Sequence, residues 1–172
     1  VDQIFIGQGV GMLGNAATNV AFPLTTISTS IALLIGVGAA SNFNLEQGGG
    51  NRERAGQIAG SGIAMLALSG IALAAAVLLF LNPLLLLFGA TEEVLPYAQS
   101  YTGITAFGIP LLIFTTGGSH MIRADGSPRY AMYCMLSGAL LNTVLDPLFI
   151  FRLDMGIAGA ALATVRAQAV SA

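Results

Sequence analysis

The sequence predicts an all-α integral membrane protein, folded as a transmembrane helix bundle. The first observation is composition: 55% of the 172 residues are hydrophobic and 8% are charged, whereas roughly a quarter of the residues of a soluble domain are charged. The second is a series of long uncharged windows, which reach the about 20 apolar residues that span a bilayer as a helix. The third is that these windows lack the alternating pattern typical of strands.

Helices are expected in six segments, separated by short polar breaks that behave as turns. The expected helices cover about residues 1–6, 16–45, 55–88, 94–122, 130–151 and 157–172. The later breaks read QGGGNRER, TEE, RADGSPR and FRLDMG, with glycine, proline and arginine where a helix should stop. The first and last segments are too short to cross a bilayer, so we expect the chain to be an excerpt of a longer protein.

The turn between the first two segments fits the pattern G-x-G-x-x-G over residues 9–14. A dinucleotide-binding fold needs that pattern inside a βαβ unit, with an acidic residue about 20 positions later. The next acidic residue is Glu46, which follows an uninterrupted apolar span. The glycines therefore indicate a tight turn between two transmembrane helices rather than a nucleotide site.

The arginines predict the orientation, because short cytoplasmic loops are enriched in basic residues. The breaks after the second and fourth segments hold Arg52, Arg54, Arg123 and Arg129, and the alternate breaks hold only Arg152. The Arg-rich turns are therefore expected on the cytoplasmic side. With no lysine and a net charge of −2, the chain offers no basic surface, so nucleic acid is not an expected partner.

Catalytic activity is not expected. The single cysteine, Cys134, excludes an internal disulfide and is typical of a buried apolar position. The single histidine, His120, has no second histidine or cysteine at metal-ligand spacing. No nucleophile and base occur in a pattern that indicates an enzyme.

Two acidic residues fall within apolar segments, where an ionised carboxylate is costly and therefore indicates function. Asp2 precedes the glycine turn by five residues, and Asp146 precedes Arg152 by six. At the helical rise per residue, both acids lie about 8 Å below the same membrane face. Asn142 shares a helical face with Asp146, and Thr164 lies somewhat deeper, about 12 Å past the last turn.

These side chains form a cluster of oxygen donors suited to a small cation such as Na⁺, or to an exchangeable proton. Pro147 follows the acid and cannot donate to the carbonyl of residue 143, which predicts a kink and a free backbone oxygen there. Apart from this coupling ion, no cofactor is expected. The alternative is structural: the acids reach headgroups or cap helix ends, and the amide and hydroxyl make ordinary interhelical hydrogen bonds.

Six stretches of the chain carry a resemblance to a known family. They are VDQIFIG, NAATNVAFPL, LEQGGGNRERAG, IRADGSPRYAM, LNTVLDPLFIF and GIAGAALATV. Together they resemble the multidrug and toxic compound extrusion (MATE) transporters, in particular a bacterial branch that includes MepA-like and DinF-like members. The resemblance implies a twelve-helix, multi-pass protein of the bacterial inner membrane, built from two six-helix lobes. Residues 1–172 would then form part of the amino-terminal lobe, from late in helix one to within helix six.

The resemblance also implies a function. Members of this family export cationic drugs or toxic organic compounds in exchange for Na⁺ or H⁺. The implied partners are organic cations, the lipid bilayer and the carboxy-terminal lobe. The family's cation site falls on Asp2, Asn142, Asp146 and Thr164, the same cluster that the depth argument identifies. Two alternatives stay open: a flippase for lipid-linked substrates with a related fold, and a non-transporting membrane scaffold subunit.

Polar residues on the second segment are candidates for lining the drug cavity, with helix-to-helix hydrogen bonds as the alternative. They are Asn15, Thr18, Asn19, Thr25 and Thr26. The chain departs from the family in the glycine run 48–50, at Tyr133, which is bulkier than usual, and at Arg166, where an apolar or small residue is usual. An arginine about ten residues into a span is costly unless it is paired or reaches the membrane surface.

Overall fold

The structure is a computed structural model that describes the backbone of residues 2–152 and 155–172, and their side chains except at 2, 3 and 151. Within these ranges every regular element is a helix. In chain order they are α1 (Asp2–Gly9), α2 (Met12–Gly48), α3 (Arg52–Leu79), α4 (Leu81–Leu87), α5 (Leu95–Ala106), α6 (Ile109–Ala124), α7 (Pro128–Pro147), the π-helical turn η1 (Leu148–Arg152) and α8 (Gly156–Ser171). The predicted all-α fold is confirmed.

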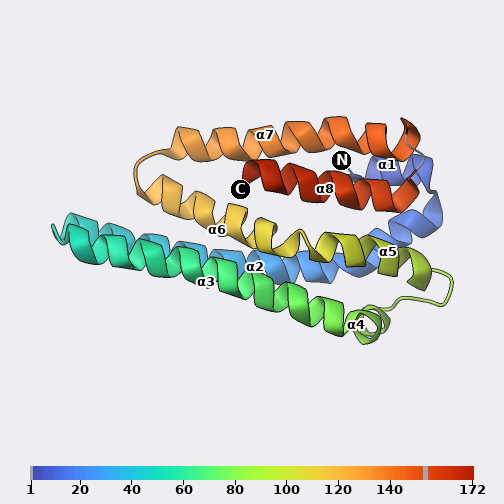
Figure 1. Cartoon of the computed structure of the whole chain (residues 1–172), viewed down its shortest axis with the longest axis horizontal. Coiled ribbons are helices and arrows are strands. Elements are labelled where there is room, and N and C mark those ends of the chain that lie inside the picture. The colour runs from blue at the N-terminus through green and yellow to red at the C-terminus, as the bar shows by residue number, and fades with distance from the viewer. Residues whose placement is uncertain (1, 153–154) are drawn as a thin grey trace.

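The helices form an elongated bundle in two halves (Figure 1). On one side, α2, α3 and α6 pack against one another around fully buried Ala32, Leu66 and Ile113. On the other side, α7 lies beside α8, and α8 joins the halves through its contacts with α5 and α6. The α2–α3 and α6–α7 turns lie at one end of the bundle (Figure 1), and the four arginines of the predicted cytoplasmic side lie in the helix ends next to these turns.

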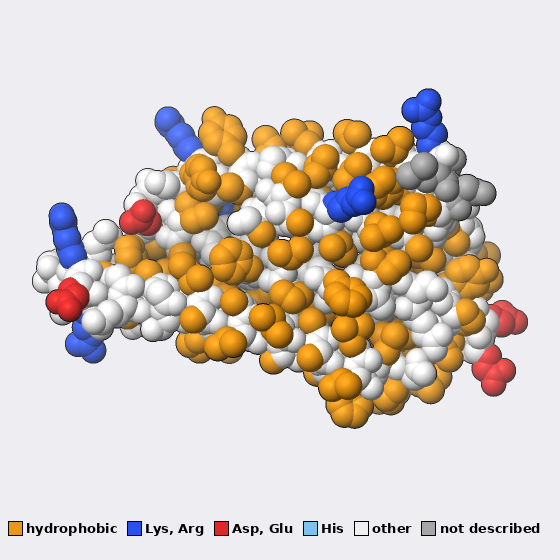
Figure 2. Space-filling view, in the orientation of Figure 1, with side chains coloured by type: hydrophobic (Ala, Val, Ile, Leu, Met, Phe, Trp, Pro, Cys, Tyr) orange, Lys and Arg blue, Asp and Glu red, His pale blue; other side chains and the backbone are white. Residues whose placement is uncertain are grey.

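The surface has the distribution expected of a membrane protein. Three helices are long and apolar enough to cross a bilayer, at Met12–Gly48, Arg52–Leu79 and Pro128–Ile150, and the bent pair α5–α6 makes a fourth if it is one span. Apolar side chains cover most of the flank of the bundle in Figure 2, and charged side chains gather toward its two ends, except for one basic side chain on the flank. The apolar surface of this flank is therefore suited to contact with lipid hydrocarbon rather than with water.

The expected single span 94–122 is in fact two helices, α5 and α6, which meet at a bend of 52°. Pro110 lies just after the bend and has no N–H to donate to the carbonyl of Ala106, four residues earlier. The N–H groups of Phe107 and Gly108 instead donate to carbonyls three residues back, at 3.2 and 2.8 Å. The tightened turn redirects the chain.

The expected span 55–88 is also divided. α3 ends at Leu79, and the short helix α4 begins at Leu81. Between them Phe80 leaves helical geometry, with φ −112° and ψ 28°. Pro83 explains the break, because in a continuous helix its ring would clash with the carbonyl of Leu79, four residues earlier.

The two turns beside the candidate cation site follow the sequence expectation in part. The helix before the glycine turn runs on to Gly9, and the reversal occurs at Gly11, whose φ of 86° suits glycine. At the other turn α7 ends at Pro147, and the chain continues as the π-helical turn η1 before α8 starts at Gly156. The disturbance predicted at Pro147 is therefore a change of helix type.

Candidate cation site and the polar cavities beside it

Asp146 lies in the last turn of α7, with a side chain that is 0% exposed. α7 packs here against η1, α8 and α1. An ionised carboxylate removed from water in this way is costly unless a cation or a proton neutralises it. Burial, which sequence cannot establish for a single acid, makes Asp146 the centre of the candidate site.

Asn142 and Thr164 come from different helices to one groove. The groove, about 370 Å³ in volume, lies between α6, α7 and α8, and both residues line it. Both side chains are half-buried. Thr164 donates its hydroxyl to the carbonyl of Ala160 at 3.0 Å. We call this space the α6–α7–α8 groove.

Asp2 is the first residue of α1, and its side chain lies outside the described part of the structure. The helix that carries it packs against both α7 and α8. The predicted grouping of Asp2 with Asn142, Asp146 and Thr164 therefore stays a prediction, with Asn142 and Thr164 on one groove and α1 beside α7 and α8.

The donor set fits a small monovalent cation or a proton. A carboxylate, an amide oxygen and a hydroxyl are hard oxygen donors. Among the described residues no three His, Cys, Asp or Glu side chains come together at metal-binding distance, so the site does not have the nitrogen and sulfur ligands that hold zinc. Na⁺ would be held by Asp146 with Asn142 and Thr164.

Of the five candidate cavity residues on α2, Thr25 lines an internal cavity of about 180 Å³ between α2, α5, α6 and α8. Ser28, one turn away on α2, lines it too. We call this space the α2–α8 cavity. Thr18 donates its hydroxyl to the carbonyl of Asn15 at 2.8 Å, and Thr26 donates to the carbonyl of Phe22 at 3.2 Å. Asn19 is exposed on α2. The contribution of the five candidate residues to a drug cavity stays a prediction.

Sequence reasoning missed the polar residues that α5, α6 and α8 bring to these spaces. Gln168 lines both the groove and the α2–α8 cavity, and Thr102 lines the cavity. Thr102 is 1% exposed. Gln168 follows Thr164 by four residues, a spacing that puts both on one helix face and was available as a signal.

Arg166 lies on the outer face of α8, where its guanidinium group sits 5.1 Å from the centroid of the Phe149 ring. A cation over an aromatic face is stabilised by the ring quadrupole. This contact helps an arginine to remain within an apolar segment. Tyr133, the second departure from the family, is 61% exposed on α7, and Gly50 in the glycine run takes a φ of 81° in the α2–α3 turn.

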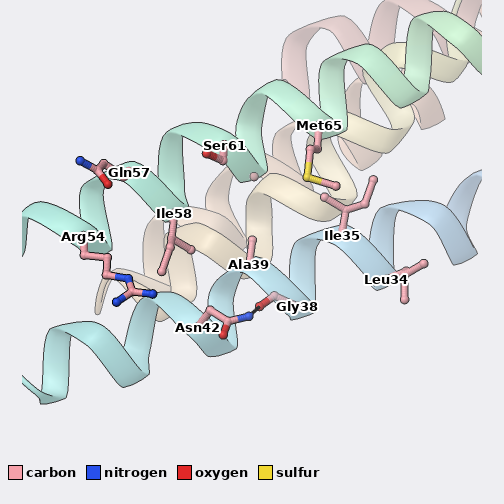
Figure 3. Close-up of a pocket in the computed structure, with 11 residues that line it drawn as sticks. Leu34, Ile35, Gly38, Ala39, Asn42, Arg54, Gln57, Ile58, Ser61 and Met65 are labelled. Carbon is pink, nitrogen blue, oxygen red and sulfur yellow. Dashed lines mark hydrogen bonds between the residues drawn. The ribbon is translucent and has the colours of Figure 1, made fainter.

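A wider groove, of about 590 Å³, lies away from the acids between α2 and α3 (Figure 3). Arg54 projects over one end of it and pairs with Glu46 of α2 at 3.3 Å. The walls are mainly apolar, with Leu34, Ile35 and Met65 toward the other end. None of the candidate cation-site residues lines it, so this groove is separate from the candidate cation site.

Comparison with known proteins identifies the family. The sequence model of the MatE family matches residues 1–148. The chain is 33% identical to the FAD transporter of Shewanella oneidensis over 95% of its length, and 32% identical to the probable multidrug resistance protein YpnP of Bacillus subtilis over 99%. It spans 37% and 38% of those proteins.

A solved structure of a MATE family transporter shares the fold of this chain. The inward-facing conformation of a multidrug resistance MATE family transporter of the MOP superfamily matches 99% of this chain with a TM-score of 0.93 and 29% identity. The match covers 38% of that transporter, as one lobe would. Members of the family are multi-pass inner-membrane transporters rather than enzymes. The chain belongs to the MATE (MatE) family and forms part of one lobe of such a transporter.

Proposed function

We propose that the complete protein is a secondary active antiporter that exports organic cations in exchange for Na⁺ or H⁺, with coupling at Asp2, Asn142, Asp146 and Thr164. The observation that carries this proposal is the complete burial of Asp146 at the end of a membrane-spanning helix. A carboxylate removed from water is stabilised when a cation or a proton neutralises its charge. Asn142, one helical turn before Asp146, and Thr164 line the α6–α7–α8 groove and would supply further oxygen donors.

Coupling requires that the coupling ion and the drug favour different conformations of the lobes. Occupation of the site neutralises Asp146 and stabilises the packing of α1, α7 and α8 around it. Release of the coupling ion leaves a charged carboxylate on buried Asp146. This charge favours a conformation in which water reaches the carboxylate. The chain changes from α-helix to π-helix directly after Pro147, next to this charge, and π-helical turns occur frequently at functional sites.

A drug pathway needs a second lobe opposite this one. The chain spans just over a third of the relatives that it matches, and α2 exposes large apolar side chains such as Phe22, Leu34 and Leu45. In the proposed assembly the carboxy-terminal lobe and the lipid bilayer cover these surfaces. A lobe alone has no opposing wall for alternating access, so transport is a property of the complete protein.

The test is efflux of a fluorescent organic cation by the complete transporter in proteoliposomes, under an imposed Na⁺ or pH gradient. Asp146→Asn removes the charge and keeps the shape, so gradient-driven efflux is expected to fall to the background rate. Asp125→Asn is the control, because Asp125 is exposed in the α6–α7 turn. Unchanged gradient-driven efflux in Asp146→Asn would contradict the proposal and favour a scaffold role. The gradient that drives the wild-type protein distinguishes Na⁺ from H⁺.

One observation favours a second substrate class, an anionic nucleotide-like compound. Arg166 presents a guanidinium group on an exposed face of α8, and such a group pairs well with phosphate. A relative at 33% identity is named as an FAD transporter. Efflux of FAD and of the organic cation would be measured side by side in Arg166→Leu. Selective loss of FAD efflux supports the anionic class, and equal loss or no loss of both argues against it.

A further inference from the structure

Two cavities and one open groove between the helices are joined by shared side chains. Thr164 and Gln168 line both the α2–α8 cavity and the α6–α7–α8 groove. Thr115 and Ser171 line both that groove and a third cavity of about 80 Å³ between α6 and α7. We call the third space the α6–α7 cavity. The three spaces therefore follow one another along α8.

The walls shared by these spaces carry polar side chains next to Leu112 and Met135, although they lie between membrane-spanning helices. On α8 the residues Thr164, Gln168 and Ser171 lie at i, i+4 and i+7, on one face, over about 10 Å of the helix axis. On the facing helix α6, Thr115 lines the groove and Ser119 lines the α6–α7 cavity. We call this continuous line of hydroxyl and amide groups the polar seam.

Two buried hydroxyl groups in the seam have no hydrogen-bond partner among the described residues. They are those of Thr102 in the α2–α8 cavity and Thr115 at the junction of the groove and the α6–α7 cavity. A buried hydroxyl without a partner is costly. A water molecule needs about 30 Å³ in the liquid and two or more polar partners, and spaces of about 180 and 80 Å³ meet that need.

The two ends of the seam give it a direction. Toward one end the groove reaches Asn142, one helical turn from Asp146. Toward the other end the α6–α7 cavity reaches Ile122 and Tyr130, which flank the turn that holds Arg123 and Arg129. The seam thus runs from the candidate cation site to the Arg-rich end of the bundle.

We propose that the polar seam is a hydrated route by which the coupling ion passes between the Asp146 site and the Arg-rich membrane face, inside this lobe and apart from the drug pathway. The proposal deepens the antiporter function proposed above and rests on it. Water ordered by Gln168 and Thr115 keeps a small cation or a proton solvated along the way. An organic drug cation needs a wider passage than the α6–α7 cavity.

The first test is thiol accessibility to Ag⁺, a monovalent cation small enough to travel with water. In the complete transporter, Cys134 and any cysteine outside these residues are replaced by Ala, and Gln168→Cys or Ser119→Cys is introduced. Ag⁺ is added at the Arg-rich face of membrane vesicles, and thiols that remain free are alkylated after denaturation. Both cysteines are expected to be blocked. The control is Leu136→Cys, on the apolar surface of α7 and 50% exposed, where hydrocarbon excludes Ag⁺. Seam thiols that react no faster than Leu136→Cys would overturn the proposal.

The second test replaces one hydroxyl without changing side-chain shape. Thr115→Val should slow gradient-driven efflux about tenfold, the effect of one lost hydrogen bond along the route, with drug binding unchanged. Thr115→Ser restores the hydroxyl and should restore the rate. If the seam is dry, Thr115→Val instead raises the thermal midpoint and leaves efflux unaltered, because it removes a buried group without a partner.

The outcomes separate the seam from the proposed function. Loss of coupling in Asp146→Asn together with unreactive seam thiols rejects the seam and keeps the antiporter. Reactive seam thiols together with intact coupling in Asp146→Asn reject the antiporter site, and with it the role of the seam in coupling.

Discussion

Gly36 of α2 lies directly against Gly117 of α6: a Cβ atom on Gly36 would come within 2.6 Å of the Gly117 Cα atom. Both residues are buried in the contact between these two helices. Because neither has a side chain, the backbones approach more closely than any other pair of residues would allow. α6 carries Thr115 and the bend at Pro110, so this contact also sets the position of the seam and of the bend.

Gly36→Ala is expected to destabilise the lobe by about 1 to 3 kcal/mol, because the added methyl group meets backbone that cannot move aside. The measurement is the midpoint of SDS denaturation of the complete transporter. Gly38→Ala is the matched control, since nothing lies within 4 Å of a Cβ at that position. It should leave stability unchanged or raise it by up to about 1 kcal/mol through helix propensity. Equal midpoints for the two variants would contradict this account of the contact.

Asn51→Ala is expected to cost about 1 kcal/mol, because Asn51 caps the amino terminus of α3. Its side-chain oxygen accepts a hydrogen bond from the backbone N–H of Arg54 at 3.3 Å. Hydrogen exchange of the first turn of α3 should speed up in the variant. Asn51→Asp keeps an acceptor and adds favourable charge at the helix terminus, so it should match the wild type. If it behaves like Asn51→Ala, the cap is not the source of the effect.

Arg166 and Phe149 are expected to stabilise each other by about 0.5 to 1 kcal/mol, as a cation over an aromatic ring at partial exposure. A double-mutant cycle with Arg166→Leu and Phe149→Leu measures this coupling through denaturation midpoints. The control cycle pairs Phe149→Leu with Arg129→Leu, at the opposite end of α7, and should be additive. A coupling of zero in the first cycle would show that Arg166 is held by something other than the ring.

Thr164→Val is expected to weaken the apparent affinity for the coupling ion about tenfold, because it removes one oxygen donor from the site and keeps the volume. The measurement is the Na⁺ or H⁺ concentration at half-maximal efflux in the complete transporter. Thr164→Ser keeps the donor and should keep the affinity. Loss of affinity in both variants would indicate a packing role for the Thr164 methyl group.

The limits of sequence reasoning are visible at two prolines. The apolar windows 55–88 and 94–122 each read as one helix, yet Pro83 and Pro110 divide them. Long Pro-containing helices do occur, and α2 continues through Pro23. Whether a proline breaks, bends or merely interrupts a helix depends on neighbouring helices that supply other contacts, and Gly70 of α3, packed against Pro110, is such a contact.

The candidate site was predictable to a similar extent. The cost of charge in hydrocarbon was enough to single out Asp2 and Asp146 from their positions alone, whereas the complete burial of Asp146 is known only from the structure. The seam was not predictable, because Thr102, Thr115 and Gln168 are unremarkable members of apolar segments until three helices bring them to shared cavities.

Sequence alone determined that this chain is a helical membrane protein with arginines near alternate turns. The reason is that the preference of each side chain for water or lipid depends on its own hydrophobicity and charge. Only the tertiary structure decided where the helices bend, how completely Asp146 is buried and which polar side chains meet. Burial and partnership depend on the packing of helices that are distant in the sequence, and no local pattern contains that information.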